Sequence, residues 1–238
     1  TREDPSLQLA RLRVRGQLSE FRAPDLRFNI DEAAEFLTEA MGVSVSADDV
    51  AALEQRTEGW IAGLQLAAIS MRGQTNPHQF VESFTGTHRF VVDYLVEEVL
   101  ARQTSAVRKF LFQTSILDRL TASLCNAVTG RDDGQMMLEQ LDQSNMLIVH
   151  LDNERRWYRY HHLFAEFLRD RLNEQLDPLE RLQLYRQAAL WCDVQGLANE
   201  TILYALKSGD EDLTLTFAKK CTQLGLRRIE SRSEGRRG

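Results

Sequence analysis

Apolar residues recur three and four positions apart along most of the chain, which is the spacing of amphipathic helices. Residues 31–42 give a clear case, with Gly42 placed as a glycine at a helix C-cap would be. After Ser46, whose hydroxyl can accept from free backbone amides, a second helix is expected. The face of the first helix that we expect to be buried carries Ala33, Phe36, Leu37, Ala40 and Met41.

The third helix is expected from Trp60 to about Arg72, and it is apolar on more than one face. A helix that is apolar nearly all round is usually surrounded by others, so we expect it at the centre of its bundle. A short helix around Phe80 and a longer one over residues 89–103 complete the group. Residues 28–104 therefore predict a compact helical bundle.

From residue 106 the pattern changes to short helices followed by two β-type segments. Residues 146–151 and 157–161 are rich in β-branched and aromatic residues and flank a polar turn, which predicts a hairpin. A further helix is expected over residues 162–172. Helices followed by a hairpin give the order of a winged helix, which we assign to residues 105–175. The helices that precede the hairpin are expected at 106–118, 122–128 and 134–144.

The last part of the chain again has helical spacing. Asp177 followed by Pro178 is typical of a helix start, and this helix is expected to end near Gly196. Further helices are expected over residues 199–208 and after 210, and such helix pairs indicate the start of a TPR-like repeat over residues 176–226. The final segment, 227–238, has five arginines and no apolar periodicity, so we expect it to be disordered.

Composition supports a mainly α fold and limits the class of function. The 238 residues contain four prolines, and the formal net charge of -6 disfavours binding to nucleic acid, which is held largely by Lys and Arg. Three separated cysteines indicate neither a disulfide framework nor a zinc site. No signal peptide or membrane-spanning run is evident, so we expect a cytoplasmic location and no membrane partner. Because the chain opens on Thr1 and enters an apolar segment at once, we expect it to be part of a longer protein.

The sequence carries no recognisable catalytic motif. No glycine is followed by lysine, so a phosphate-binding P-loop is absent, and no G-x-S-x-G nucleophile motif occurs. Neither catalytic residues nor a metal site is therefore expected, and we do not expect the chain to be an enzyme.

DNA binding by the winged helix is disfavoured by charge. The helix that would enter the major groove, residues 134–144, has two acidic residues and no Lys or Arg. Arg155, Arg156 and Arg159 of the hairpin could contact a phosphate backbone, although arginines in a hairpin are more often simply solvated. We therefore expect no DNA contact from this domain.

His161 and His162 stand between the second strand and the following helix. Neighbouring side chains on a strand point to opposite faces, so the pair is a poor metal site. Two readings remain for His161, an imidazole hydrogen-bonded within the junction or one that faces a ligand.

Four segments together resemble a known family, the large ATP-binding LuxR-type (MalT-like) transcription regulators of the signal-transduction ATPases with numerous domains. The resemblance covers about residues 1–225, and the second and fourth segments are fairly specific. The segments are Thr1–Pro5 with Leu9–Arg13, Thr57–Ala67, Arg119–Leu120 and Trp157–Phe164.

The resemblance implies a domain plan and a cofactor. Such regulators have a P-loop ATPase core, a helical lid, a winged helix, a helical-repeat sensor and a C-terminal helix-turn-helix. By this comparison residues 1–27 are the end of the ATPase core and residues 28–104 are the lid. The P-loop and the DNA-binding domain would lie outside this chain, so ATP or ADP is expected for the full-length protein and no cofactor for this chain alone.

The resemblance also assigns nucleotide-binding residues. Arg2 matches the sensor arginine near the terminal phosphate, and His161 matches the histidine that touches the β-phosphate of ADP. Gly63 lies in the lid turn where many relatives have Gly-x-Pro against the adenine, and Gln65 replaces that proline here. An imidazole can donate to a phosphate oxygen, so the assignment to His161 is chemically reasonable.

The function implied is a conformational switch between the ATPase core and the sensor, inactive by itself. ADP would favour a closed form, and the ATP-bound open form would self-associate. The expected partners are the missing ATPase core and sensor repeats, with DNA bound only through a missing helix-turn-helix. The alternative is a free-standing helical module that binds a protein partner without any nucleotide.

Overall fold

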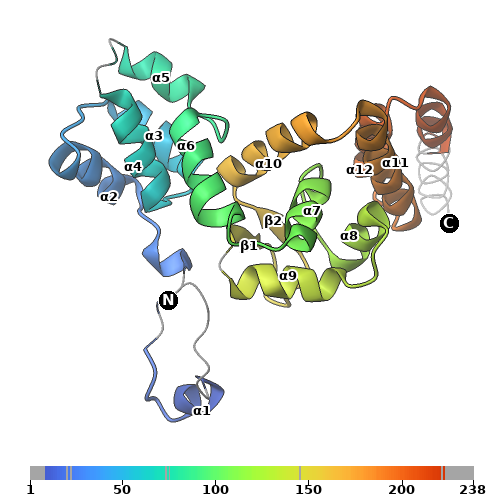
Figure 1. The fold of residues 1–238 in the computed structure, drawn as a ribbon, viewed down its shortest axis with the longest axis horizontal. Coiled ribbons are helices and arrows are strands. Elements are labelled where there is room, and N and C mark those ends of the chain that lie inside the picture. The colour runs from blue at the N-terminus through green and yellow to red at the C-terminus, as the bar shows by residue number, and fades with distance from the viewer. Residues whose placement is uncertain are drawn as a thin grey trace, which may run out of the picture.

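The computed structural model is mainly helical with one small β-hairpin, as the sequence predicted. Three groups of elements follow one another along the molecule: a helical bundle, a winged helix and a set of long helices (Figure 1). The buried apolar residues form one continuous cluster that extends through all three groups. The structure describes residues 9–19, 21, 23–72, 74, 76–144, 146–220 and 222.

The bundle is built from short helices with conventional caps. Asn29 and Glu32 form a reciprocal capping box at the start of α2, and the Ser46 hydroxyl accepts from the amide of Asp49 at the start of α3. The helix start predicted at Ser46 is therefore confirmed. The elements are α1 (Leu9–Val14), η1 (Ala23–Leu26), α2 (Ile30–Glu35), η2 (Phe36–Ala40), α3 (Ala47–Thr57), α4 (Ile61–Met71), α5 (Pro77–Ser83), α6 (Arg89–Tyr94) and η3 (Leu95–Leu100).

The helix predicted over residues 31–42 ends in a π-helical turn, η2, in place of regular α-helix. The amide of Met41 donates to the carbonyl of Phe36, five residues earlier. A π-helical turn therefore holds one residue more than an α-helical turn, and this rotates the end of the helix. Ala40 is exposed as a result, although its spacing predicted burial. Gly42 has a left-handed backbone and ends the helix as predicted.

Helix α4 packs against α3, α5, α6 and η2, so it is central to the bundle as its composition led us to expect. One of its faces is buried, including Leu64 and Met71. On another face Ile61 and Ile69 are 36% and 38% exposed. Apolar content alone could not show that the bundle leaves this one stripe of the helix uncovered.

The winged helix has the predicted order of helices and hairpin. Tyr160 pairs with Ile148 across the antiparallel strands, and its hydroxyl lies 2.7 Å from that of Thr114 in the core. Tyr158 and Tyr160 are buried on one face of the hairpin, so Arg159 between them points to the other. The elements are α7 (Ser105–Thr114), α8 (Ala122–Thr129), α9 (Gly134–Gln143), β1 (Ile148–His150), β2 (Tyr158–Tyr160) and α10 (His162–Gln175).

The final group contains α11 (Pro178–Val194), α12 (Ala198–Lys207) and a helix over residues 211–220. Helices α11 and α12 pack side by side (Figure 1), and α11 also contacts α8. The hydroxyl of Tyr204 accepts from the amide of Asp118, which joins this group to the winged helix. Among the residues described, no helix combines the length and the apolar character needed to cross a bilayer.

Candidate functional site at the junction of the bundle and the winged helix

The two most specific sequence motifs meet at the junction between the bundle and the winged helix. Helix α3 ends at Thr57, and Glu58 and Gly59 both adopt left-handed backbone conformations that turn the chain toward Trp60. A Cβ on Gly59 would lie 2.2 Å from the carbonyl oxygen of Phe28, so only glycine fits. This turn presents the Glu58 side chain to the hairpin.

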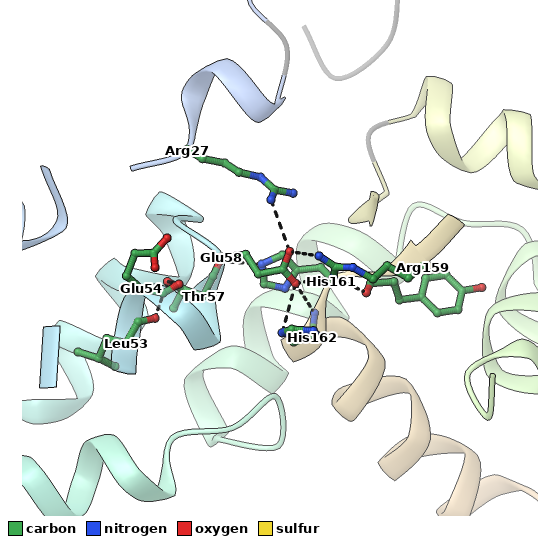
Figure 2. Close-up of polar contacts among 9 residues, drawn as sticks. Arg27, Leu53, Glu54, Thr57, Glu58, Arg159, His161 and His162 are labelled. Carbon is green, nitrogen blue, oxygen red and sulfur yellow. Dashed lines mark hydrogen bonds and ion pairs between the residues drawn. The ribbon is translucent and has the colours of Figure 1, made fainter. Parts of the chain in front are cut away.

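Glu58 is the centre of a charged network that spans the junction (Figure 2). The Arg159 guanidinium donates to both carboxylate oxygens, at 2.7 and 2.8 Å. Arg27 approaches from the segment before α2 at 3.5 Å, and the amide of His162 donates at 3.0 Å. The Glu58 side chain is only 8% exposed, so this pairing is largely shielded from water.

The electrostatics of Glu58 depend on the winged helix. Its carboxylate lies at the C-terminal end of α3, where a negative charge is unfavourable, and at the N-terminal end of α10, where it is favourable. Burial alone would raise the pKa of Glu58. The hydrogen bond from Arg159, the electrostatic interaction with the nearby His161 ring and the hydrogen bond from the His162 amide together lower that pKa to about 2. The winged helix thus supplies the groups that stabilise this carboxylate.

His161 lies beside this network and is 3% exposed. Its Nε2 lies 2.7 Å from the carbonyl oxygen of Thr57, and because a carbonyl only accepts, Nε2 carries the proton. Its Nδ1 is buried and has no hydrogen-bond partner among the residues described. Burial lowers the pKa of the imidazole, which favours the neutral ring.

Trp60 connects His161 to the start of α4. The rings of Trp60 and His161 meet edge to face with centroids 5.6 Å apart. A Cβ on Gly63 would lie 2.8 Å from the Trp60 ring and 3.2 Å from a methyl group of Thr57. The absence of a side chain at Gly63 therefore allows the indole to pack here.

A second contact joins the same two parts of the chain. The amide of Gly86, in the loop after α5, donates to the Glu166 carboxylate of α10 at 2.7 Å. A Cβ on Gly86 would lie 1.9 Å from the carbonyl oxygen of Leu163. The loop thus approaches α10 closely enough to require glycine.

The structure brings together two of the three residues assigned to nucleotide binding. His161 and Gly63 both lie close to Trp60, whereas Arg2 lies outside the residues that the structure describes. The His161 ring is buried against the Thr57 carbonyl oxygen, whereas the His162 side chain is 59% exposed and its Nδ1 lies 3.5 Å from the Glu58 carboxylate. The Gln65 side chain is exposed.

Sequence reasoning missed Glu58 and Arg159 as the charged pair of the junction. A signal existed for each, since an acidic residue at a helix C-terminus needs a compensating cation and Arg159 alternates with buried tyrosines. Neither signal identifies the partner, because the two residues are 101 positions apart.

Several charges around the hairpin are paired with nearby residues. His150 and Arg155 both approach Asp142 of α9, at 2.8 and 3.7 Å, and Arg156 approaches Glu154 at 3.0 Å. The described residues contain no group of three or more His, Cys, Asp or Glu side chains that could hold a metal ion.

Most of this chain is similar to segments of larger known proteins. Residues 96–180 match the family of the MalT winged helix domain. The chain is 34% identical over 204 residues to the serine/threonine-protein kinase PknK of Mycobacterium tuberculosis, which covers 86% of this chain and 18% of that protein. It is 36% identical over 212 residues to the HTH-type transcriptional regulator MalT of Klebsiella pneumoniae, which covers 88% of this chain and 23% of that protein. The chain thus spans about a fifth of the length of these relatives.

Proposed function

We propose that this chain is the lid and winged-helix part of a nucleotide-controlled, LuxR-type transcription regulator, where it couples an ATPase core to a sensor. By itself it would have no catalytic activity. The observation that carries the proposal is the junction in which Glu58 of the bundle is held by Arg159 of the winged helix. Both residues belong to the two motifs on which the resemblance to these regulators mainly rests.

The chemistry of the junction suits a switch better than a permanent interface. Its polar contacts are an ion pair, a histidine-to-carbonyl bond and a glycine-to-carboxylate bond. Charged pairs of this kind contribute little net stability once desolvation is counted, but they select one arrangement of the two parts. A second arrangement in which the charges regain water would therefore differ by only a few kcal/mol, on the order of a ligand's differential affinity.

His161 is the residue best suited to sense a nucleotide. Its buried Nδ1 has no partner among the described residues, and a phosphate oxygen could accept from this atom if it carried a proton. An adjacent phosphate charge would favour that protonation, against the effect of burial. ADP or ATP would be held mainly by a P-loop core outside this chain, with Arg2 near the terminal phosphate. Gly63 would act through its contact with Trp60.

The relatives support a coupling role that does not depend on one type of output. The same segment occurs in a protein named as a kinase and in one named as a transcriptional regulator. This supports a role for the segment that is separate from phosphorylation and from direct DNA reading. In the full-length protein DNA would be contacted through a separate helix-turn-helix, because Glu139 and Asp142 make α9 acidic. We place the protein in the cytoplasm, with the ATPase core, the sensor repeats and a second copy of the regulator as partners.

A second candidate is a helical module that binds a protein partner without nucleotide. It is favoured by exposed apolar side chains on the last helices, including Val194 at 80% and Leu206 at 62%. This candidate predicts that replacing His161 does not change the affinity of the protein for any nucleotide.

ADP affinity tests the first candidate against the second. This chain would replace the matching segment of the Klebsiella pneumoniae regulator, and ADP binding would be measured by calorimetry. We expect His161→Ala to weaken binding about tenfold or more, as loss of a charge-assisted hydrogen bond would. The matched control is His150→Ala, since His150 lies in the same hairpin but pairs with Asp142, away from the junction. Equal ADP affinity in all three proteins, with each one folded, would reject the first candidate.

A further inference from the structure

A groove lies between α7 and the C-terminal half of α10, with the π-helical segment η3 forming one wall. Its volume is about 700 Å³, within the range of roughly 300–1,000 Å³ found for small-molecule sites. It is separate from the Glu58 junction, since neither Glu58 nor His161 lines it. The side chains on which the inference rests are Leu100, Arg108, Lys109, Phe112 and Arg171.

The floor of the groove is apolar. Leu100 and Phe112 are 7% and 8% exposed, and Leu176 from the end of α10 adds a partly buried wall. Val96 of η3 lines the groove and is 40% exposed. A ligand with an apolar body could cover these side chains.

The rim of the groove is cationic. Arg108 and Lys109 are exposed and have no ion-pair partner among the described residues. Arg171 lies over the Phe167 ring at 5.7 Å and donates through one nitrogen to Glu174, while its Nε has no acceptor among the described residues. None of the residues that line the groove is Asp or Glu. This concentration of positive charge occurs in a chain whose formal net charge is -6.

The first turn of α7 adds to the positive potential. Ser105, the first residue of this ten-residue helix, lines the groove, and the Thr104 hydroxyl accepts only from the amide of Val107. The N-terminal end of a helix favours anions and disfavours cations. Arg108 and Lys109 lie about one turn into α7, near its N-terminal end, so the helix dipole does not stabilise their positive charges. A bound anion would compensate all of these charges together.

We propose that this groove binds a small amphiphilic anion, that is, a carboxylate or phosphate monoester with an apolar tail. The head group would lie between Arg108, Lys109 and Arg171, and the tail would cover Leu100 and Phe112. Such a ligand would bridge η3 of the bundle to α10 of the winged helix. This inference does not depend on nucleotide binding at His161.

Decanoate is the first probe, titrated into the chain below its micelle concentration and followed by NMR of the methyl groups of Ala101 and Leu176. We expect saturable binding that weakens as salt is added. Decyl phosphate should also bind, which identifies the class, whereas decanol has the same tail without charge and should bind at least about tenfold more weakly. Inorganic phosphate alone should not shift the Leu176 methyl groups.

The double variant Arg108→Gln and Lys109→Gln tests the assignment. Both side chains are exposed, so the fold should persist, which circular dichroism can check. We expect decanoate affinity to fall about tenfold or more. The matched control, Arg155→Gln with Arg156→Gln, also removes two exposed positive charges, but from the hairpin. Equal affinity in both double variants, equal binding of decanol, or no binding of decanoate to the original chain would each overturn the proposal.

Discussion

The Arg159 guanidinium holds both carboxylate oxygens of Glu58, at 2.7 and 2.8 Å, across 101 positions of sequence. The pair joins the turn after α3 to the second strand of the winged helix, so it fixes how two parts of the chain meet. Its strength follows from two parallel charge-assisted bonds in a place that water hardly reaches.

Replacing Glu58 with Gln should destabilise the chain by about 2 to 3 kcal/mol, because it leaves Arg159 and Arg27 without a counter-charge. The free energy of unfolding can be measured by urea denaturation. Glu54→Gln is the matched control, since Glu54 lies one turn earlier in α3 and its carboxylate pairs with no described residue. A double-mutant cycle with Arg159→Met should give a coupling of about 1 kcal/mol or more. No coupling would mean that the two charges are independent.

Acid should remove the contribution of Glu58 over a defined range of pH. Its pKa is lowered to about 2 in the folded chain from 4.5. Its stabilising effect is therefore complete above pH 4.5 and is lost as the pH falls toward 2. The difference in unfolding free energy between the original chain and Glu58→Gln should shrink over this range. A difference that stays constant with pH would show that the effect of the substitution is not electrostatic.

His161 and His78 should titrate on opposite sides of the ordinary histidine pKa. Burial lowers the pKa of His161, whereas the hydrogen bond to the Asp49 carboxylate, 2.7 Å away, raises that of His78. NMR of the ring carbons against pH should therefore place His161 below 6.5 and His78 above it. The reverse order would contradict the buried position of His161.

These two histidines make opposite contributions to stability against pH. His78 stabilises the fold fully below the pKa of 6.5 that it has when unfolded, and this effect is lost as the pH rises through its higher folded value. His161 is held neutral, so its contribution is present above 6.5 and is lost as acid protonates the buried ring. His78→Gln should therefore cost more stability near pH 5.5 than near pH 8.5, values chosen to bracket the histidine range.

Gly86→Ala should loosen the second contact between the bundle and the winged helix. The added methyl group would lie 1.9 Å from the Leu163 carbonyl oxygen, so the loop must move and the bond to Glu166 is lost. We expect a cost of about 2 kcal/mol or more in thermal unfolding experiments. Gly130→Ala is the control, because Gly130 is left-handed but has nothing within 4 Å, and it should cost only about 1 kcal/mol. Equal costs would show that the contact at Gly86 carries no energy of its own.

The sequence by itself determined the secondary structure and the order of the elements. The helix start at Ser46, the helix end at Gly42 and the hairpin after residue 146 depend on caps, glycine and residue type within a few positions. Such signals are local, because backbone sterics and the first free amides of a helix involve only neighbouring residues. The sequence also placed His161 and His162 between the second strand and the following helix, where they lie.

Only the tertiary structure decided which side chains meet and which faces stay open. The bond between Glu58 and Arg159, the exposed side of α4 at Ile69 and the cationic groove around Arg171 all depend on how distant elements are placed. Even the exposure of Ala40 was decided by one extra residue in a helical turn. A periodic pattern gives the direction of a side chain relative to its own helix or strand. It does not identify the surface opposite, because that surface comes from residues far away in the chain.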